Sequence, residues 1–386
     1  MSFYGIDDTG VSSDQESSDQ GVKILFPKLK YLSLEDMPNL KEWMEVEVTQ
    51  KAGSAVVFPI LKELTVENYF QLITAPSRFP SLKRLHISSL YHGSSVITKI
   101  CSKVITLTSL SIISVRELAF LPDWLPHKNH GLTDLDLICC PDLTDIVLKT
   151  KLPDDFHALQ SLVSTNIYGC HSLQSFPIPR PSHRLISIRV LQIVNCDELI
   201  HLPSEMVESL RPLESLTVKN CRKLISIPKG LGSLPSLRVL IIGPFAEGME
   251  FNALVDFFDG LQQPSSSSSS LRELNLYGLL QWHSLPDQLQ HLSALKKLYL
   301  SNLGPEVLPD WFANLSSLEH LSLCNCVNLG HLPSMEAMRH LSKLWRLDIY
   351  DCPLLKGRCI KRSSLDSEWS KIRSIPEVRI DEVRIQ

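Results

Sequence analysis

The sequence predicts an α/β solenoid, an elongated stack of about thirteen short repeats rather than one compact core. Three observations predict it. The 386 residues exceed the roughly 250–300 at which single hydrophobic cores stop growing. The pattern LxxLxLxx(C/L)xxL recurs along the chain, and Leu-Pro or Ile-Pro steps follow many of its copies. Each copy should therefore add one strand and one return segment to the stack.

The clear copies of the pattern occupy residues 29–40, 132–143, 213–224, 295–308, 318–329 and 344–355, and weaker copies open at Leu61, Leu82, Leu110, Leu162, Ile188, Leu237 and Leu271. A period of roughly 20 to 30 residues with this core motif is typical of leucine-rich repeats. In an LxLxx strand, alternate side chains point to opposite faces, so the leucines face the core. We expect a curved horseshoe with a parallel β-sheet on the concave face, and loops and short helices on the convex face.

The repeat pattern also predicts the domain organisation. An acidic, disordered segment covers residues 1–22, the repeat array covers 23–358, and a C-terminal cap or tail covers 359–386. Insertions at 44–57 and 261–270 lengthen two repeats. The serine tract in the second insertion predicts an exposed loop, with a linker between two sub-arrays as the alternative. In the cap, Trp369, Ile372 and Ile375 should pack on the last coil.

Cysteines recur at one position of the repeat, where the strand ends and the chain turns inward. Leu279 and Leu303 occupy this position in two other repeats. Six of the ten cysteines occupy it: Cys140, Cys170, Cys196, Cys221, Cys326 and Cys352. A small apolar residue with a weak S–H donor suits such a corner. We therefore interpret these cysteines as structural rather than as redox or metal sites.

No motif for chemistry appears in the sequence. GxxxxGK[ST], GxSxG, HExxH and GxGxxG are all absent, and the cysteines lack zinc-finger spacing. We predict a non-enzyme with no catalytic residues, no cofactor and no metal. The net charge of −4 gives no general attraction to nucleic acid, and no apolar run predicts a membrane span. The polar N-terminus and the scattered cysteines favour a reducing compartment, so a cytoplasmic or nucleo-cytoplasmic protein is expected.

Without catalysis, the outward positions of the concave sheet form the predicted binding surface, because the core does not need them. Toward the C-terminus these candidate protein-binding residues are Glu273, Asn275, Tyr277, Lys297, Tyr299, His320, Arg346, Asp348 and Tyr350. Tyrosine and arginine are enriched at interface hot spots. Tyrosine also simply suits strands, which is the alternative reading. Stacked coils should set Tyr277 and Tyr299 side by side.

Several segments carry a family resemblance: FPKLKYLSLEDMPNLKEW (26–43), FPSLKRLHI (79–87), LPDW (121–124 and 308–311) and EWSKIRSIPEVRI (368–380). Over about residues 22–380, the chain resembles the leucine-rich-repeat region of plant intracellular nucleotide-binding disease-resistance receptors of the coiled-coil class. The resemblance implies binding of a pathogen effector or a guarded host protein. It also implies autoinhibitory docking on the receptor's own nucleotide-binding domain, if the chain is part of a longer one. It carries over no nucleotide binding, because the sequence has no counterpart of that domain.

Two other classes remain open. A stand-alone repeat adaptor, such as a ubiquitin-ligase substrate receptor or a decoy, would use the same surface, although a ligase adaptor needs an F-box domain before the array. An extracellular receptor ectodomain would need a signal peptide and usually the LxGxIP form of the repeat, which the sequence lacks.

Overall fold

A computed structural model gives the fold of the chain, which divides into two compact units, Met1–Ser172 and Leu173–Gln386. The structure describes residues 24–45, 56–122, 131–146, 161–176, 187–261, 270–360 and 367–386. The predicted N-terminal segment 1–22 lies outside these residues, as do most of the insertions 44–57 and 261–270.

In the first unit, each repeat contributes one parallel strand: β2 (Tyr31–Glu35), β4 (Glu63–Glu67), β5 (Arg84–Ser88), β6 (Ser109–Ile113), β7 (Asp134–Ile138) and β8 (Ser164–Tyr168). Strands β1 (Ile24–Leu25) and β3 (Val56–Val57) form a separate two-stranded sheet. Helix α1 (Gly93–Cys101) follows β5 and buries Val96, Ile97 and Ile100.

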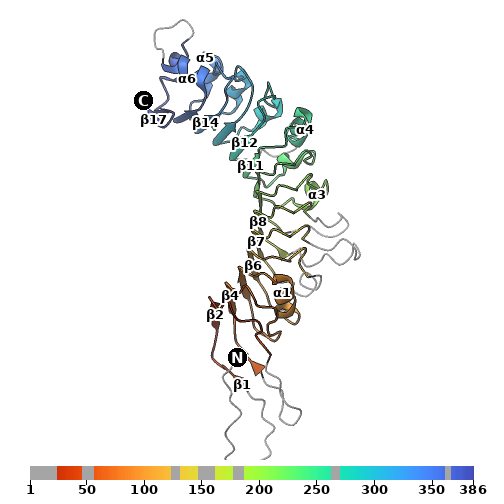
Figure 1. The fold of residues 1–386 in the computed structure, drawn as a ribbon. Helices are drawn as coiled ribbons and strands as arrows, with labels where there is room; N and C mark the ends of the chain where they lie inside the picture. Colours follow the sequence, from red (N-terminus) through yellow and green to blue (C-terminus); the bar gives the residue numbers. More distant parts are fainter. Residues whose placement is uncertain are drawn as a thin grey trace, which may run out of the picture. The chain divides into compact units, whose positions relative to one another are not determined.

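In the second unit, the strands are β9 (Val190–Val194), β10 (Ser215–Lys219), β11 (Val239–Gly243), β12 (Glu273–Tyr277), β13 (Lys297–Ser301), β14 (His320–Cys324), β15 (Arg346–Tyr350), β16 (Glu377–Ile380) and β17 (Val383–Arg384). The return segments carry α3 (Met206–Ser209), α4 (Phe251–Phe257), α5 (Met335–His340), α6 (Pro353–Ile360), α7 (Trp369–Ile372) and the 3₁₀ turns η2 (Leu231–Ser233), η3 (Asp287–His291) and η4 (Asp310–Asn314). Within this unit, β11, β12 and β14 line the inner side of the curve, and α4, α5 and α6 lie on the outer side (Figure 1).

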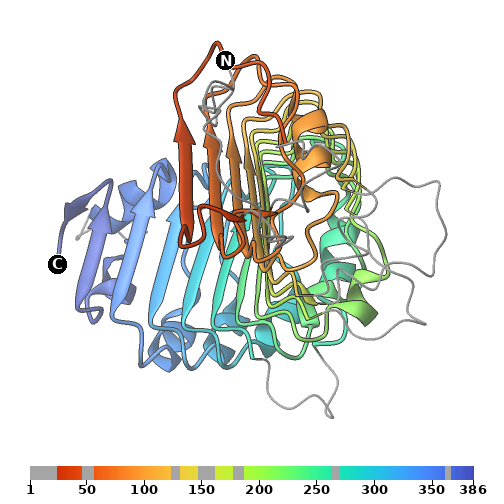
Figure 2. The ribbon, with the colours of Figure 1, turned by 90° about the horizontal axis from the view of Figure 1, so that it is seen from below.

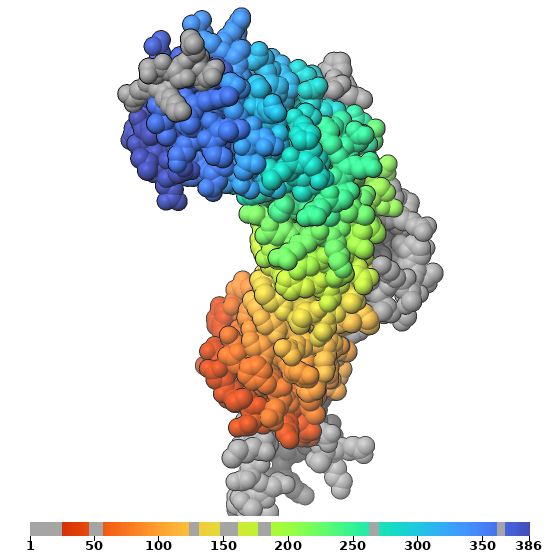
Figure 3. Space-filling view, turned by 45° about the horizontal axis from the view of Figure 1, so that its top comes forward, coloured from red at the N-terminus to blue at the C-terminus, as the bar shows by residue number. Residues whose placement is uncertain are grey.

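Equivalent positions of successive repeats pair directly with one another. Leu216 of β10 pairs with Leu191 of β9 and Leu240 of β11, and all three side chains are fully buried. The strands of the second unit accordingly run side by side in one direction, except the antiparallel β17 (Figure 2). In the space-filling view, the atoms of the second unit, coloured from yellow-green to blue, form a closely packed body (Figure 3). The predicted leucine-rich-repeat solenoid is confirmed. Each of the thirteen predicted repeats contains one strand, and these strands are β2 and β4 to β15.

One predicted register was wrong. Strands begin two residues after the opening residue of a repeat, as with Ser215 after Leu213, but β6 begins at Ser109. The fourth repeat therefore opens at Leu107 and not at Leu110, which is the first buried leucine within its strand. Both leucines are fully buried, so burial does not distinguish them, and only the hydrogen-bonded pairing of Leu110 with Leu85 fixes the register.

The turn after each strand has a recurring construction. Asn195, Asn220, Asn302 and Asn325 each follow a strand and have a positive φ, between 51° and 57°. Asparagine tolerates this left-handed conformation better than other side chains do. Its side-chain amide also bonds to the preceding repeat, as from Asn220 Nδ2 to Asn195 Oδ1 at 3.0 Å. The corner cysteines lie just beyond; the thiol of Cys221 is buried and donates to the carbonyl of Lys219 at 3.7 Å. Their structural role is thus visible in the packing.

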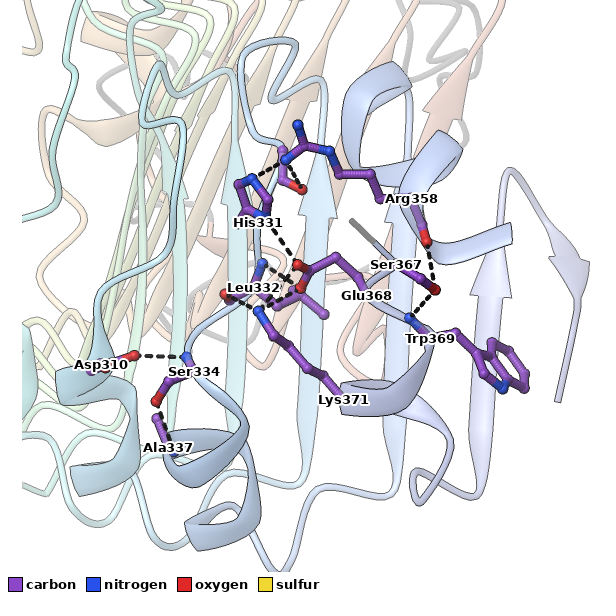
Figure 4. Close-up of polar contacts among 11 residues, drawn as sticks. Asp310, His331, Leu332, Ser334, Ala337, Arg358, Ser367, Glu368, Trp369 and Lys371 are labelled. Carbon is purple, nitrogen blue, oxygen red and sulfur yellow. Dashed lines mark hydrogen bonds and ion pairs between the residues drawn. The ribbon is translucent and has the colours of Figure 1, made fainter. Parts of the chain in front are cut away.

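The C-terminal segment adds a further strand to the array. Strand β16 pairs in parallel with β15, and β17 folds back antiparallel on β16. Ile372 and Ile375 are buried, and Trp369 is half-buried. A buried carboxylate, Glu368, joins this segment to the repeats before it (Figure 4).

Candidate protein-contact surface

The candidate surface consists of the outward positions of β9–β16, which alternate with the buried leucines and valines of the second unit. We call it the sheet face. On β12, Glu273, Asn275 and Tyr277 alternate with buried Leu274 and Leu276. The strand register sets the predicted residues in three rows across the sheet. These rows are Glu273–Lys297–His320–Arg346–Glu377, Asn275–Tyr299–Ser322–Asp348–Arg379 and Tyr277–Ser301–Cys324–Tyr350.

The charged half of the sheet face, on β14–β16, is neutralised internally. Asp348 is only 2% exposed. Its Oδ2 accepts hydrogen bonds from His320 Nε2 at 2.7 Å and from Arg346 Nε at 2.9 Å. Glu377 in turn pairs with Arg379 Nε at 2.7 Å. The hydrogen bond to Asp348 is the main cause of the raised pKa of Arg346. Asp348 thus lies at the predicted place but is covered, and it orients His320 and Arg346, which remain partly exposed.

The other half of the sheet face is aromatic and apolar. The rings of Tyr277 and Tyr299 lie side by side as predicted, with centroids 5.2 Å apart and planes inclined by 46°. They come from different rows, since Tyr277 pairs with Ser301 in the strand register. Burial raises the pKa of Tyr299, so its hydroxyl stays protonated at neutral pH. Half-buried Val239 and Ile241 of β11 continue this apolar area.

Sequence reasoning missed Lys219, which lies at the end of β10. Its Nζ is 3.1 Å from the Tyr277 hydroxyl and 4.5 Å from the centre of that ring. The two residues are separated by β11, whose residue in register with Lys219 is Gly243. The only signal in the sequence was this glycine at a strand position. Glu377 and Arg379 were also missed, although EVRI (377–380) has the alternation of a strand.

A second polar cluster lies between the last repeats and the C-terminal segment. Glu368, 3% exposed, accepts hydrogen bonds from His331 Nδ1 at 2.9 Å and from the Leu332 amide at 3.1 Å. Lys371 Nζ is 2.8 Å from Oε2 and 3.1 Å from Oε1 of the same carboxylate. Arg358 donates to Nε2 of His331, and Nδ1 of the same ring faces Glu368 (Figure 4). Each of these groups is bonded to another, and the bonds link the C-terminal segment to the last repeats. We call this cluster the clamp.

Among the described residues, no group of three His, Cys, Asp or Glu side chains is placed to hold a metal ion. In the same residues, no helix is long and apolar enough to cross a membrane.

Residues 287–352, which include β13, β14 and β15, match the family model described as R13L1/DRL21 LRRs. TMV resistance protein N of Nicotiana glutinosa is 29% identical over 301 residues, 72% of this chain and 25% of that protein. Protein SUPPRESSOR OF npr1-1, CONSTITUTIVE 1 of Arabidopsis thaliana is 26% identical over 249 residues, 64% of this chain and 15% of that protein.

This chain carries leucine-rich repeats related to those of plant disease resistance proteins. It spans a quarter or less of the length of the two relatives above. Among solved structures, the Toll–Spatzle complex of Drosophila aligns with 79% of this leucine-rich-repeat chain and 49% of its own chain, at 15% identity and a TM-score of 0.48.

Proposed function

We propose that this chain is the protein-recognition module of a plant innate-immune receptor, and that the sheet face binds a pathogen effector or a guarded host protein. The module works inside the cell and carries out no catalysis. Where it belongs to a longer chain, it also contacts that chain's nucleotide-binding domain and contributes to autoinhibition. The relationship to disease resistance proteins supports the immune role.

One observation carries the choice of surface: the adjoining rings of Tyr277 and Tyr299, which lie at outward positions of β12 and β13. Aromatic side chains that pack on one another lose little conformational freedom when a partner covers them. The charged rows beside them need no partner, because Asp348 and Glu377 already neutralise their cations. Binding energy is therefore expected to concentrate at the tyrosines.

The test is a binding screen of the purified chain against purified pathogen effectors and host proteins, measured by biolayer interferometry. A double variant, Tyr277→Ser with Tyr299→Ser, should weaken binding at least tenfold, since each hot-spot aromatic contributes about 2 kcal/mol. The matched control is Phe70→Ser with Tyr91→Ser, two exposed aromatics of the first unit. Arg346 is left unchanged because it holds the buried Asp348.

Binding that the tyrosine variant and the control weaken equally would contradict the sheet face as the contact surface. A screen without any saturable binder would contradict the recognition role toward the proteins tested.

A further inference from the structure

On the basis of the proposed function, we infer the chemistry of the partner: the sheet face receives an acidic protein segment whose carboxylate lies next to a large apolar side chain. The receiving group, which we call the lysine–tyrosine cluster, consists of Lys219, Tyr277, Tyr299 and Ile241. The carboxylate would bind the ammonium of Lys219 and the hydroxyl of Tyr277, and the apolar side chain would lie against Ile241 and the tyrosine rings.

The first argument is charge. Among the described residues on the sheet face, Lys297 is 3.5 Å from Glu273, while Arg346 and Arg379 pair with Asp348 and Glu377. Lys219 contacts no carboxylate there; it contacts the hydroxyl and the ring of Tyr277. A tyrosine hydroxyl leaves the positive charge of the lysine uncompensated. On the described sheet face of the second unit, uncompensated positive charge is therefore concentrated at the lysine–tyrosine cluster.

The second argument is the shape that Gly243 creates. Strands β10 and β12 flank β11 and are about 9.6 Å apart, twice the usual strand spacing. Lys219 crosses β11 where Gly243 has no side chain, and thus reaches Tyr277. Gly243 has a φ of +93°, and a Cβ there would be 1.9 Å from the Tyr277 carbonyl oxygen. The backbone thus keeps the space beside Tyr277 free of a side chain, and the ammonium is held at a defined place over the ring.

The third argument is the apolar surrounding. Val194 pairs with Lys219 in the strand register, and Ile241 lies two positions before Gly243 on the same face of β11. Tyr277 and Tyr299 border the other side. In such surroundings an ion pair is screened less than on an open surface, which favours a carboxylate that arrives with its own apolar neighbour.

The same facts exclude a nucleic-acid backbone as the occupant. Binding a line of phosphates requires a line of free cations. The other sheet-face cations on β12–β16, as far as the structure describes them, are already paired with carboxylates. An acidic segment of a protein, with one carboxylate and one apolar side chain, matches one free ammonium beside an apolar surface.

The test uses a phage-displayed library of random 12-residue peptides, selected on the intact immobilised chain after depletion on the Lys219→Glu variant. The matched control is depletion on Lys223→Glu, which makes the same change of charge four residues away. Lys223 lies in the turn, exposed and paired with Glu198, so its loss should affect stability little. Thermal melting of both variants checks that they fold like the parent chain.

Peptides that survive depletion on Lys219→Glu should carry Asp or Glu beside Leu, Ile, Phe or Trp. Synthetic copies should bind the parent chain at least tenfold more tightly than Lys219→Glu, and equally well to the parent and Lys223→Glu. Their Asn or Gln versions should lose at least tenfold in affinity, because a charge-assisted hydrogen bond is lost.

Three results would overturn the inference: no enrichment, enrichment without acidic residues, or the same peptides from both depletions. The inference and the proposed function fail separately. A protein from the binding screen that depends on Tyr277 and Tyr299 but not on Lys219 would remove the inference and leave the recognition role in place.

Discussion

Replacing Glu368 by alanine should detach the C-terminal segment, residues 367–386, from the repeats that precede it. The carboxylate is 3% exposed and accepts from His331 and from the Leu332 amide, while Lys371 neutralises it. Alanine would leave the Leu332 N–H without this acceptor and Lys371, whose side chain is only 19% exposed, without its carboxylate. Removing one partner of a buried charged pair costs about 3–5 kcal/mol. We take about 3 kcal/mol, because Lys371 also bonds to the Leu332 carbonyl.

The assay is hydrogen exchange by mass spectrometry. A local opening that becomes 3 kcal/mol easier should speed exchange roughly a hundredfold in β16, whose strand pairing with β15 depends on the cap being docked. Exchange in β12 and β13 should stay near that of the parent chain. Glu368→Gln should show a smaller effect, since the amide oxygen can still accept from the Leu332 N–H.

The control is Glu336→Ala, an exposed carboxylate on α5 that belongs to the same region. If β16 exchanges at the parental rate in Glu368→Ala, the clamp does not hold the C-terminal segment and the reasoning is refuted.

Three further predictions concern the array itself. Leu216→Asp places a charge in the fully buried ladder and should destabilise the chain by several kcal/mol, so an unchanged thermal melting curve would contradict the register. Gly243→Ala should lower the melting temperature as well, because its φ of +93° and the nearby Tyr277 carbonyl oppose a Cβ; a parental melting temperature would speak against the close approach. The hydrogen bond from Lys356 holds the pKa of Asp381 below its usual value, so this carboxylate stabilises the fold above about pH 4, and that contribution is lost as the pH falls further. Asp381→Asn should therefore cost up to about 1 kcal/mol in urea unfolding at pH 7 and less at pH 3, and equal costs at both would contradict this account.

The sequence by itself determined the features that depend on local periodicity. A leucine at every second strand position, as with Leu274 and Leu276 of β12, specifies which face is buried, and repetition of the motif specifies a stack. The corner cysteines and the outward position of Tyr277 follow from the same alternation. Even the error at Leu110 has a local cause: Leu107 and Leu110 both fit the motif, and their burial is equal.

Only the tertiary structure decided which outward residues touch. Lys219 and Tyr277 are 58 residues apart, and they meet because lateral stacking places Gly243 between them. Asp348 occupies an outward position yet is covered, since His320 of β14 and Arg346 of its own strand turn toward it. Alternation along one strand states the face on which a side chain lies. Its exposure and its partners depend on strands that come from distant parts of the chain, and no local pattern contains that information.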